Sequence, residues 1–166
     1  MDKRYAKLAN FGKKLLGVST LSASLPIISK YAKEVIGAER CSIFVYSEDR
    51  DTLWTTLADE TEPIIIPSTR GIVGHTLKVK KPVIVFDASK DPLYLREIEE
   101  ETGYKINNII TAPVFNSQRE IIGVLELLNK PKGFDDDDVK FMIFFAHYIS
   151  GYIELATRYD DSSLMA

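Results

Sequence analysis

Two apolar stretches joined by a short polar break predict a β-hairpin late in the chain. Ile109–Phe115 is rich in β-branched and aromatic side chains, and Ile121–Leu128 is apolar apart from Gly123 and Glu126. The five polar residues between them have the length of a hairpin turn. Because the second stretch is apolar on both faces, we expect a central strand that is covered on both sides. A carboxylate in such a strand is costly without a partner, so the role of Glu126 needs an explanation.

Helical periodicity marks both ends of the chain. Apolar residues three and four apart predict a helix over Asp2–Val18 and a second over Leu21–Ile36, with Pro26 in its first turn. The longest helix is predicted to start at Asp135–Asp138, whose charges offset the helix dipole, and to run to about Tyr159. The acidic run is thereby explained without a metal site.

The last predicted helix carries two apolar stripes at heptad spacing. One domain buries one such stripe, so the other needs the N-terminal helix of the same chain or a second copy of the protein. The first stripe consists of Val139, Met142, Ala146, Ile149, Ile153 and Ala156, and the second of Phe141, Phe145, Tyr148, Tyr152 and Leu155.

The middle of the chain is a series of short elements. The pattern predicts strands over Arg40–Tyr46, Thr52–Ala58, Ile64–Ile66 and Val83–Phe86, a helix over Gly71–Val79 capped by Thr69, a polar loop over Asp87–Tyr94 and a Glu-rich helix over Leu93–Thr102. This order predicts an α+β fold. We expect a central antiparallel sheet with the terminal helices on one face and the middle insertions over the other.

Composition narrows the functional classes. The 166 residues suit one domain, and a net charge of −3 without a basic stripe argues against nucleic-acid binding. A single cysteine, Cys41, excludes a disulfide framework and thiolate metal clusters. No apolar run reaches the roughly 18 residues of a membrane span, and no signal peptide is visible, so we expect a cytoplasmic protein. His75 and His147 have no third ligand at metal-binding spacing, and no catalytic triad or phosphate-loop pattern appears.

Several motifs in the same order resemble those of a GAF domain. They are Gly71–His75, Lys81–Val83, Asp87–Pro92, Thr102–Tyr104, Asn108–Ile110 and Ile122–Lys130. The resemblance spans about Leu21–Leu155 and is greatest to GAF domains of cyclic-nucleotide phosphodiesterases and adenylyl cyclases. It implies one GAF domain over residues 1–166, with about six strands. Residues 1–20 would form a connecting or dimerisation helix, 21–155 the core, and 156–166 the helix end and tail.

A family signature also implies one structural ion pair. GAF domains of this kind carry an Asn-Lys pair, then a Phe and an Asp-Glu pair. Asn129, Lys130, Phe134 and Asp138 match this signature, whereas Val139 stands in place of the Glu. The resemblance implies a salt bridge between Lys130 and Asp138, with no ligand contact of its own.

The resemblance further implies a ligand pocket between the sheet and the middle helices. Ser42 and Thr102 would offer hydroxyls, and Glu126 and Glu99 would accept hydrogen bonds from a base or sugar. Backbone amides at a helix start suit a phosphate. The implied pocket residues are Ser42, Asp59, Ile72, Val73, Glu99, Thr102 and Glu126.

Three departures leave the identity of the ligand open. Ala58 replaces an aromatic that stacks on the base in cyclic-nucleotide-binding members, and Leu95 and Ile106 replace a Tyr and a Thr. Loss of base stacking removes about 1–3 kcal/mol of binding free energy. A cyclic nucleotide, another small ligand and a closed ligand-free pocket are therefore all open, and Glu126 could instead pair with a residue such as Lys105 or Asn107.

The expected function is that of a non-catalytic sensory domain. Methionine sulfoxide reductases of the GAF type need a nucleophilic and a resolving cysteine, and bilin attachment needs a cysteine within Gly71–Asn108; the chain offers neither. No cofactor is required. We expect ligand binding to order Asp87–Asn108 and to change how the terminal helices pair in a parallel homodimer, acting on an attached output domain. The rival hypothesis is a dimerisation scaffold without a ligand.

Overall fold

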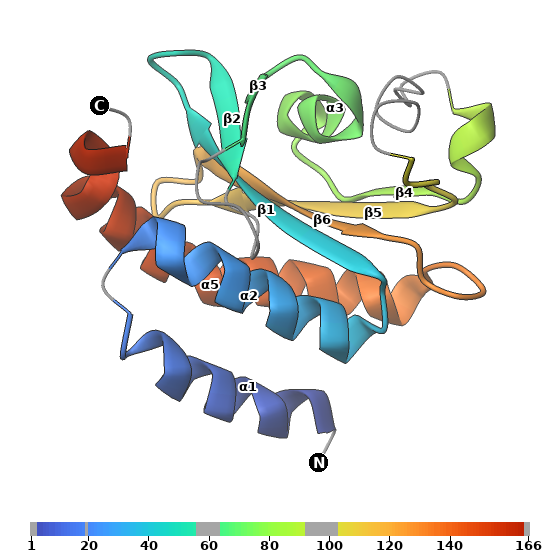
Figure 1. Cartoon of the computed structure of the whole chain (residues 1–166), viewed down its shortest axis with the longest axis horizontal. Helices are drawn as coiled ribbons and strands as arrows, with labels where there is room; N and C mark the ends of the chain where they lie inside the picture. The colour runs from blue at the N-terminus through green and yellow to red at the C-terminus, as the bar shows by residue number, and fades with distance from the viewer. Residues whose placement is uncertain (1–2, 19, 56–63, 92–102, 165–166) are drawn as a thin grey trace.

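A six-stranded antiparallel sheet organises the part of the chain that the structure describes (Figure 1). The structure is a computed structural model that describes residues 3–18, 20–55, 64–91 and 103–164. The strands lie in the order β3-β2-β1-β6-β5-β4. Their bounds are Arg40–Ser47 (β1), Thr52–Thr55 (β2), Ile64–Pro67 (β3), Val83–Val85 (β4), Ile109–Phe115 (β5) and Ile121–Leu128 (β6).

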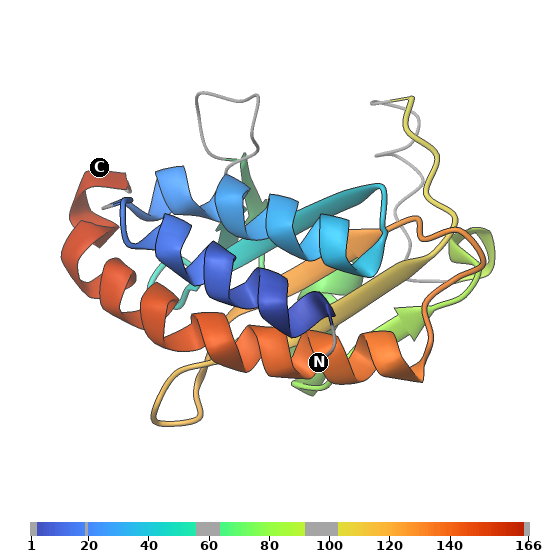
Figure 2. The ribbon, with the colours of Figure 1, turned by 90° about the horizontal axis from the view of Figure 1, so that it is seen from below.

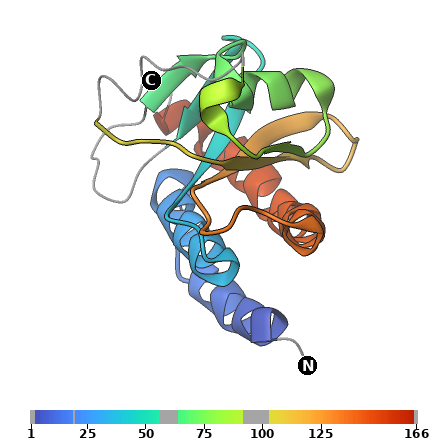
Figure 3. The same cartoon turned by 90° about the vertical axis from the view of Figure 1, so that its right-hand side faces the viewer.

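Helices cover both faces of this sheet. Their bounds are Lys3–Leu15 (α1), Leu21–Ile36 (α2), Gly71–Val79 (α3) and Asp136–Leu164 (α5), with a short 3-10 helix at Ala88–Lys90. Figure 3 shows α2 and α5 on one face and α3 on the other. Seen from below, α1 lies against α2 and α5 as an outer layer (Figure 2). The arrangement confirms the predicted α+β fold.

The two central strands match the hairpin predicted from the sequence. β5 and β6 pair antiparallel, and β6 pairs on its other side with β1. Ile64–Pro67 forms an edge strand, as expected for an apolar run between prolines. β2 ends at Thr55 and β4 at Val85 within the described residues, whereas the predicted helix over Leu93–Thr102 lies outside them.

Local signals explain the bounds of α2. The Thr20 hydroxyl accepts a hydrogen bond from the Ala23 amide at 3.3 Å, and Gly37 adopts a left-handed conformation at the C-terminal end. The prediction that Pro26 lies in the first turn is wrong, because the helix starts at Leu21 and Pro26 is its sixth residue. Pro26 has no amide hydrogen, so the helix loses one backbone hydrogen bond at this point.

The prediction of Thr69 as the cap of α3 is also wrong. The N-cap residue is Arg70, and its side chain makes no capping hydrogen bond. The preceding chain packs directly against the helix: a Cβ atom on Gly74 would lie 2.6 Å from the Thr69 carbonyl carbon. The first turn of α3 is therefore held by backbone packing and leaves its amides without a side-chain acceptor.

The two stripes of α5 have different surroundings. Met142, Ala146, Ile149 and Ile153 of the first stripe are buried against the sheet and α2. The second stripe is divided, because Phe141 and Phe145 are buried whereas Tyr148 and Leu155 are 43% and 57% exposed. α5 extends to Leu164, beyond the predicted end at Tyr159, and α1 ends at Leu15 rather than at Val18.

An aromatic cluster explains this division. Phe11 of α1 stacks on Tyr31 of α2 with ring centroids 4.5 Å apart, and it lies 5.6 Å from the ring of Phe145. The Tyr152 hydroxyl also donates to the Val18 carbonyl at 3.3 Å. The N-terminal segment of the same chain thus packs on Phe145 and contacts Tyr152, whereas Tyr148 and Leu155 of the second stripe stay largely exposed.

Candidate ligand site

A row of polar side chains crosses the α3 face of the sheet. Glu126 on β6 lies directly opposite Ser42 on β1 and opposite Thr111 on β5. Leu125 and Leu127, its neighbours on β6, belong to the core on the α2 and α5 side. Because side chains alternate along a strand, Glu126 and its two cross-strand partners face α3.

The first turn of α3 lies over this row. Ile72 packs with Ile109 and Leu128, whereas Val73 packs with Phe44 and Val124. Val124 and Leu128 flank Glu126 on the same face of β6, so the start of α3 lies over the carboxylate. The side chains of both predicted residues are apolar packing groups. Their backbone amides find no hydrogen-bond acceptor among the described residues.

Two threonines fasten α3 to the sheet beside this row. The Thr76 hydroxyl donates to the Ile72 carbonyl at 2.8 Å, and it lies 2.6 Å from the Thr111 hydroxyl. Since Thr76 has one hydroxyl hydrogen, Thr111 is the donor in the second contact. The sequence analysis missed Thr111, although it is a hydroxyl in an apolar strand that the hairpin register brings opposite Glu126.

Glu126 has no hydrogen-bond or ion-pair partner within the described part of the chain. Within the described ranges, neither Lys105 nor Asn107 makes a hydrogen bond or ion pair with Glu126. The backbone carbonyl of Lys105 and the backbone amide of Asn107 bind the side chain of Asn129. Burial raises the pKa of the Glu126 carboxyl from 4.5 to about 7. The group is therefore poised to bind a hydrogen-bond donor or to hold a proton near neutral pH.

Thr55 is a second polar residue that the sequence analysis missed. It is 1% exposed, and its hydroxyl has no hydrogen-bond partner in the part of the chain that the structure describes. Nothing in the local sequence distinguishes it from the neighbouring threonines at positions 52 and 56. Only the structure shows that this hydroxyl is both buried and unpaired.

The remaining predicted positions are only partly described. Asp59, Glu99 and Thr102 lie outside the described residues, as do the substituted positions Ala58 and Leu95. Ile106, the third substituted position, packs on the cluster of Ile72, Val85, Ala88 and Ile109. The structure thus brings Ser42 and Glu126 together under the start of α3 and adds an apolar wall that includes Ile106.

Asn129 connects the irregular segment that leads into β5 to the end of β6. Its side-chain oxygen accepts hydrogen bonds from the amides of Asn107 and Asn108 at 2.6 and 3.2 Å. Its side-chain nitrogen donates to the Lys105 carbonyl at 2.8 Å and to the Tyr104 hydroxyl at 3.0 Å. The residue is 5% exposed, so these contacts are shielded from water.

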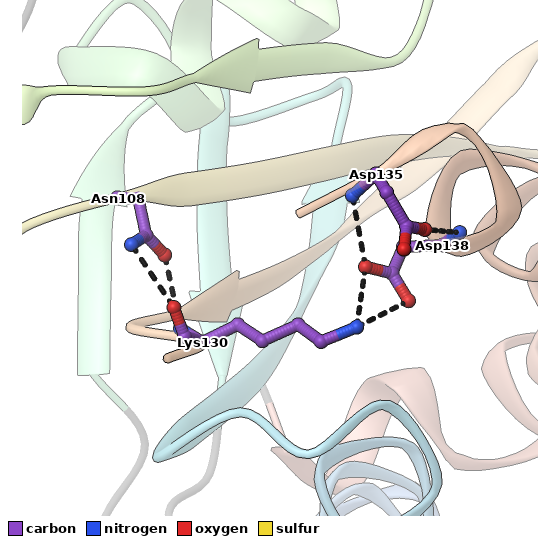
Figure 4. Close-up of polar contacts among 4 residues, drawn as sticks. All are labelled: Asn108, Lys130, Asp135 and Asp138. Atoms are coloured by element: carbon purple, nitrogen blue, oxygen red, sulfur yellow. Dashed lines mark hydrogen bonds and ion pairs between the residues drawn. The ribbon is translucent and has the colours of Figure 1, made fainter. Parts of the chain in front are cut away.

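Lys130 extends this connection to α5 (Figure 4). The Asn108 side chain binds the backbone of Lys130, accepting from its amide at 2.9 Å and donating to its carbonyl at 3.1 Å. The Lys130 ammonium pairs with Asp138 at 2.7 Å. The Asp135 amide donates to the same Asp138 carboxylate at 3.0 Å, and Asp138 is 3% exposed. The segment before β5 is thereby connected through Lys130 to the first turn of α5.

A groove of about 720 Å³ lies elsewhere on the molecule. It runs between α3 and the turns of the two hairpins, with His75, Leu77 and Arg119 among its lining residues, and none of the predicted ligand residues lines it. Its charged side chains have both signs.

The described residues do not favour a metal site or a reactive cysteine. Within the described ranges, no three His, Cys, Asp or Glu side chains are grouped to hold a metal ion. Burial raises the pKa of the Cys41 thiol, which disfavours the reactive thiolate. No helix in the described ranges is long and apolar enough to cross a membrane.

Comparison with known proteins relates the chain to one family. The GAF domain model matches residues 20–153. A cGMP-specific 3',5'-cyclic phosphodiesterase of Drosophila ananassae is 39% identical over 93 residues, which are 54% of this chain and 8% of that protein. The chain therefore corresponds to a small part of this relative.

Two solved structures illustrate the similarity of fold. The GAF domain of an Acinetobacter phosphoenolpyruvate-protein phosphotransferase superposes with a TM-score of 0.76 at 19% identity, covering 95% of this chain and 97% of that chain. The free methionine-R-sulfoxide reductase of Neisseria meningitidis, in complex with its substrate, gives a TM-score of 0.74 at 19% identity and covers 95% and 94%. At these identities the likeness concerns the fold alone.

Proposed function

Because this chain belongs to the GAF domain family, we propose that it is a non-catalytic regulatory domain that binds a small molecule over the α3 face of its sheet. The proposal rests mainly on Glu126, a carboxylate in a central strand that has no hydrogen-bond or ion-pair partner among the described residues. Glu126 is half-buried, and a desolvated carboxyl without a hydrogen-bond partner destabilises the folded state unless a bound molecule supplies the missing hydrogen bonds.

The chemistry of the site favours a ligand with two kinds of polar group. Glu126 and Ser42 suit hydrogen-bond donors of a base or sugar, whereas the uncapped amides at the start of α3 suit an anionic group. A cyclic nucleotide carries both, and the phosphodiesterase of Drosophila ananassae is specific for cGMP by its name. Cyclic GMP is therefore the first compound to test, followed by cyclic AMP.

Thermal unfolding with cyclic nucleotides tests this proposal directly. A ligand at 100 times its Kd stabilises the folded state by about 2.7 kcal/mol, which raises the Tm of a domain of this size by roughly 5–10 °C. Glu126→Gln keeps the size of the side chain and removes its charge, and it should reduce the shift. Glu34→Gln on the exposed face of α2 is the matched control and should keep the full shift.

The connection through Asn108, Lys130 and Asp138 supports a route for the signal. In the proposed mechanism, the ligand changes the position of the segment that leads into Asn108, and the Lys130–Asp138 pair passes this change to α5. The free energy comes from the preference of the ligand for one of the two arrangements. An attached output domain would respond to the movement of the helix.

Exposed apolar side chains on α5 support pairing of two copies through the terminal helices. Ile143, Phe144, Tyr148 and Leu155 are 40–57% exposed and follow one side of the helix. We propose a homodimer in which this strip is buried. The strip includes Tyr148 and Leu155, the residues of the second stripe that α1 leaves exposed. The rival function is a dimerisation scaffold, and it is favoured if no compound stabilises the protein whereas the dimer still forms.

A further inference from the structure

The buried hydroxyl of Thr55 lies on the same face of the sheet as the candidate site and has no hydrogen-bond partner among the described residues. Leu53 of β2 packs with Phe44 and Val73 on the α3 side, whereas Trp54 packs in the opposite core. Alternation along β2 therefore directs the side chain of Thr55 toward the α3 face. The residue is 1% exposed, and within the described ranges its oxygen reaches no acceptor or donor.

The strand register brings Thr55 close to the predicted ligand residues. Trp54 lies opposite Val45, so the next pair along the ladder joins Thr55 to Phe44, two residues from Ser42 on the same face. Such diagonal neighbours lie about 7–8 Å apart, and directly opposed residues such as Ser42 and Glu126 about 5 Å. Thr55, Ser42 and Glu126 therefore form a row across the adjacent strands β2, β1 and β6, and this row is about as long as a small metabolite.

The fold satisfies other hydroxyls on this face. Thr76 and Thr111 hydrogen-bond to each other at 2.6 Å across the contact between α3 and β5. Thr55 makes no such contact with any described residue, although an unpaired buried hydroxyl destabilises the folded state. Its packing therefore gives no structural reason for a threonine at this position.

We infer that the Thr55 hydroxyl is a specificity-determining contact for the ligand of this site. This inference rests on the proposed function and adds a requirement to it. The ligand carries an uncharged hydrogen-bonding group, such as a hydroxyl, carbonyl or amide, at the end remote from Glu126. A charged group is disfavoured there because Thr55 has no charge and its neighbours on this face, Phe44 and Leu53, are apolar.

Three valine variants separate this role from a structural one. Thr55→Val removes an unpaired hydroxyl from the α3 face, and Thr52→Val removes an unpaired hydroxyl from the opposite face of the same strand. Thr76→Val removes a hydroxyl that has partners. Without ligand, we expect Tm to stay the same or rise for the first two variants and to fall for Thr76→Val.

Titration with cyclic GMP then tests the contact itself. Loss of one hydrogen bond to the ligand should weaken binding by about fivefold to tenfold in Thr55→Val. Thr52→Val should bind as the unsubstituted protein does, and Thr55→Ser, which keeps the hydroxyl, should restore most of the affinity. These comparisons use the whole chain, so no isolated fragment has to fold.

Three other outcomes would contradict the role of Thr55 or the proposed ligand binding. Equal binding by Thr55→Val and the unsubstituted protein would overturn the inference and leave the proposed function standing. A fall in the ligand-free Tm of Thr55→Val as large as that of Thr76→Val would also overturn it, because the hydroxyl would then have a structural partner. No binding of cyclic GMP, cyclic AMP or any compound of a metabolite panel by the unsubstituted protein would reject the proposed function and this inference together.

Discussion

Lys130 and Asp138 form a two-oxygen ion pair between the end of β6 and the first turn of α5. The ammonium nitrogen lies 2.9 and 2.7 Å from the two carboxylate oxygens. The Lys130→Met variant leaves the Asp138 carboxylate buried without its cation. We expect the free energy of unfolding to fall by about 3 kcal/mol, as measured by urea denaturation.

An exposed pair in the same chain provides the control. Lys90 and Asp87 are 3.8 Å apart, with side chains 83% and 48% exposed. Lys90→Met should change the free energy of unfolding by less than about 0.5 kcal/mol. Similar losses in both lysine variants would contradict the importance of burial for the Lys130 pair.

The side chain and the backbone of Asn129 can be tested separately. Its φ of 59° is left-handed, a conformation that glycine adopts without strain. Asn129→Gly should lower the free energy of unfolding by about 2–4 kcal/mol, because the amides of Asn107 and Asn108 lose their shared acceptor. Asn129→Ala should cost about 1 kcal/mol more, since alanine also pays for the left-handed backbone.

Lys132 is the control for the backbone component. It has a φ of 67° and is exposed. Lys132→Gly should leave the free energy of unfolding within about 0.5 kcal/mol of the unsubstituted value. If Asn129→Gly were equally harmless, the hydrogen bonds of Asn129 would contribute nothing measurable to stability.

The raised pKa of Glu126 makes stability depend on pH in a definite direction. The carboxyl has a pKa of about 7 in the folded protein and 4.5 as the reference value, so the folded state binds the proton more tightly. Its contribution is fully present below pH 4.5 and is lost as the pH rises through about 7. Relative to Glu126→Gln, the unsubstituted protein should lose about 1–3 kcal/mol between pH 4.5 and pH 8.

Urea denaturation of both proteins at several pH values measures this difference. Other carboxyl groups titrate in both proteins and cancel in the comparison. A difference that stays constant from pH 4.5 to pH 8 would show that the Glu126 carboxyl has an ordinary pKa in the folded protein.

Two isoleucines with similar exposure test the proposed dimer. Ile143 on α5 is 51% exposed, and Ile65 on β3 is 53% exposed. If the α5 strip is the interface, Ile143→Lys should weaken the dimer at least tenfold in sedimentation equilibrium, whereas Ile65→Lys should leave it unchanged. A monomeric unsubstituted protein at tens of micromolar would remove the basis for signalling through paired helices.

Much of the fold follows from local signals in the sequence. The helix α2 lies between a capping Thr and a capping Gly. The observed range of α3, Gly71–Val79, is the range that the sequence pattern predicts. The hairpin of β5 and β6 follows from two apolar stretches and a polar turn. In each case the determining residues lie within a few positions of one another.

The features that were missed depend on distant contacts. The burial of Phe145 depends on Phe11, which is far away in the sequence and reaches it only after α1 docks. Thr55 and Thr111 lie on the same face as Glu126 because of the strand order and the register of the sheet, which no local sequence pattern indicates. The hydrogen bonds of Asn129 join segments more than 20 residues apart, which no local pattern indicates.

The pairing of β1 with β6 has a consequence for synthesis on the ribosome. β1 is made early, yet its inner edge is completed only when residues 121–128 emerge. Until then, the nascent chain exposes the backbone groups of Ile43 and its neighbours to any other extended segment. Fragments that end before Ile121 should therefore aggregate when they are expressed, whereas chains that include β6 should not.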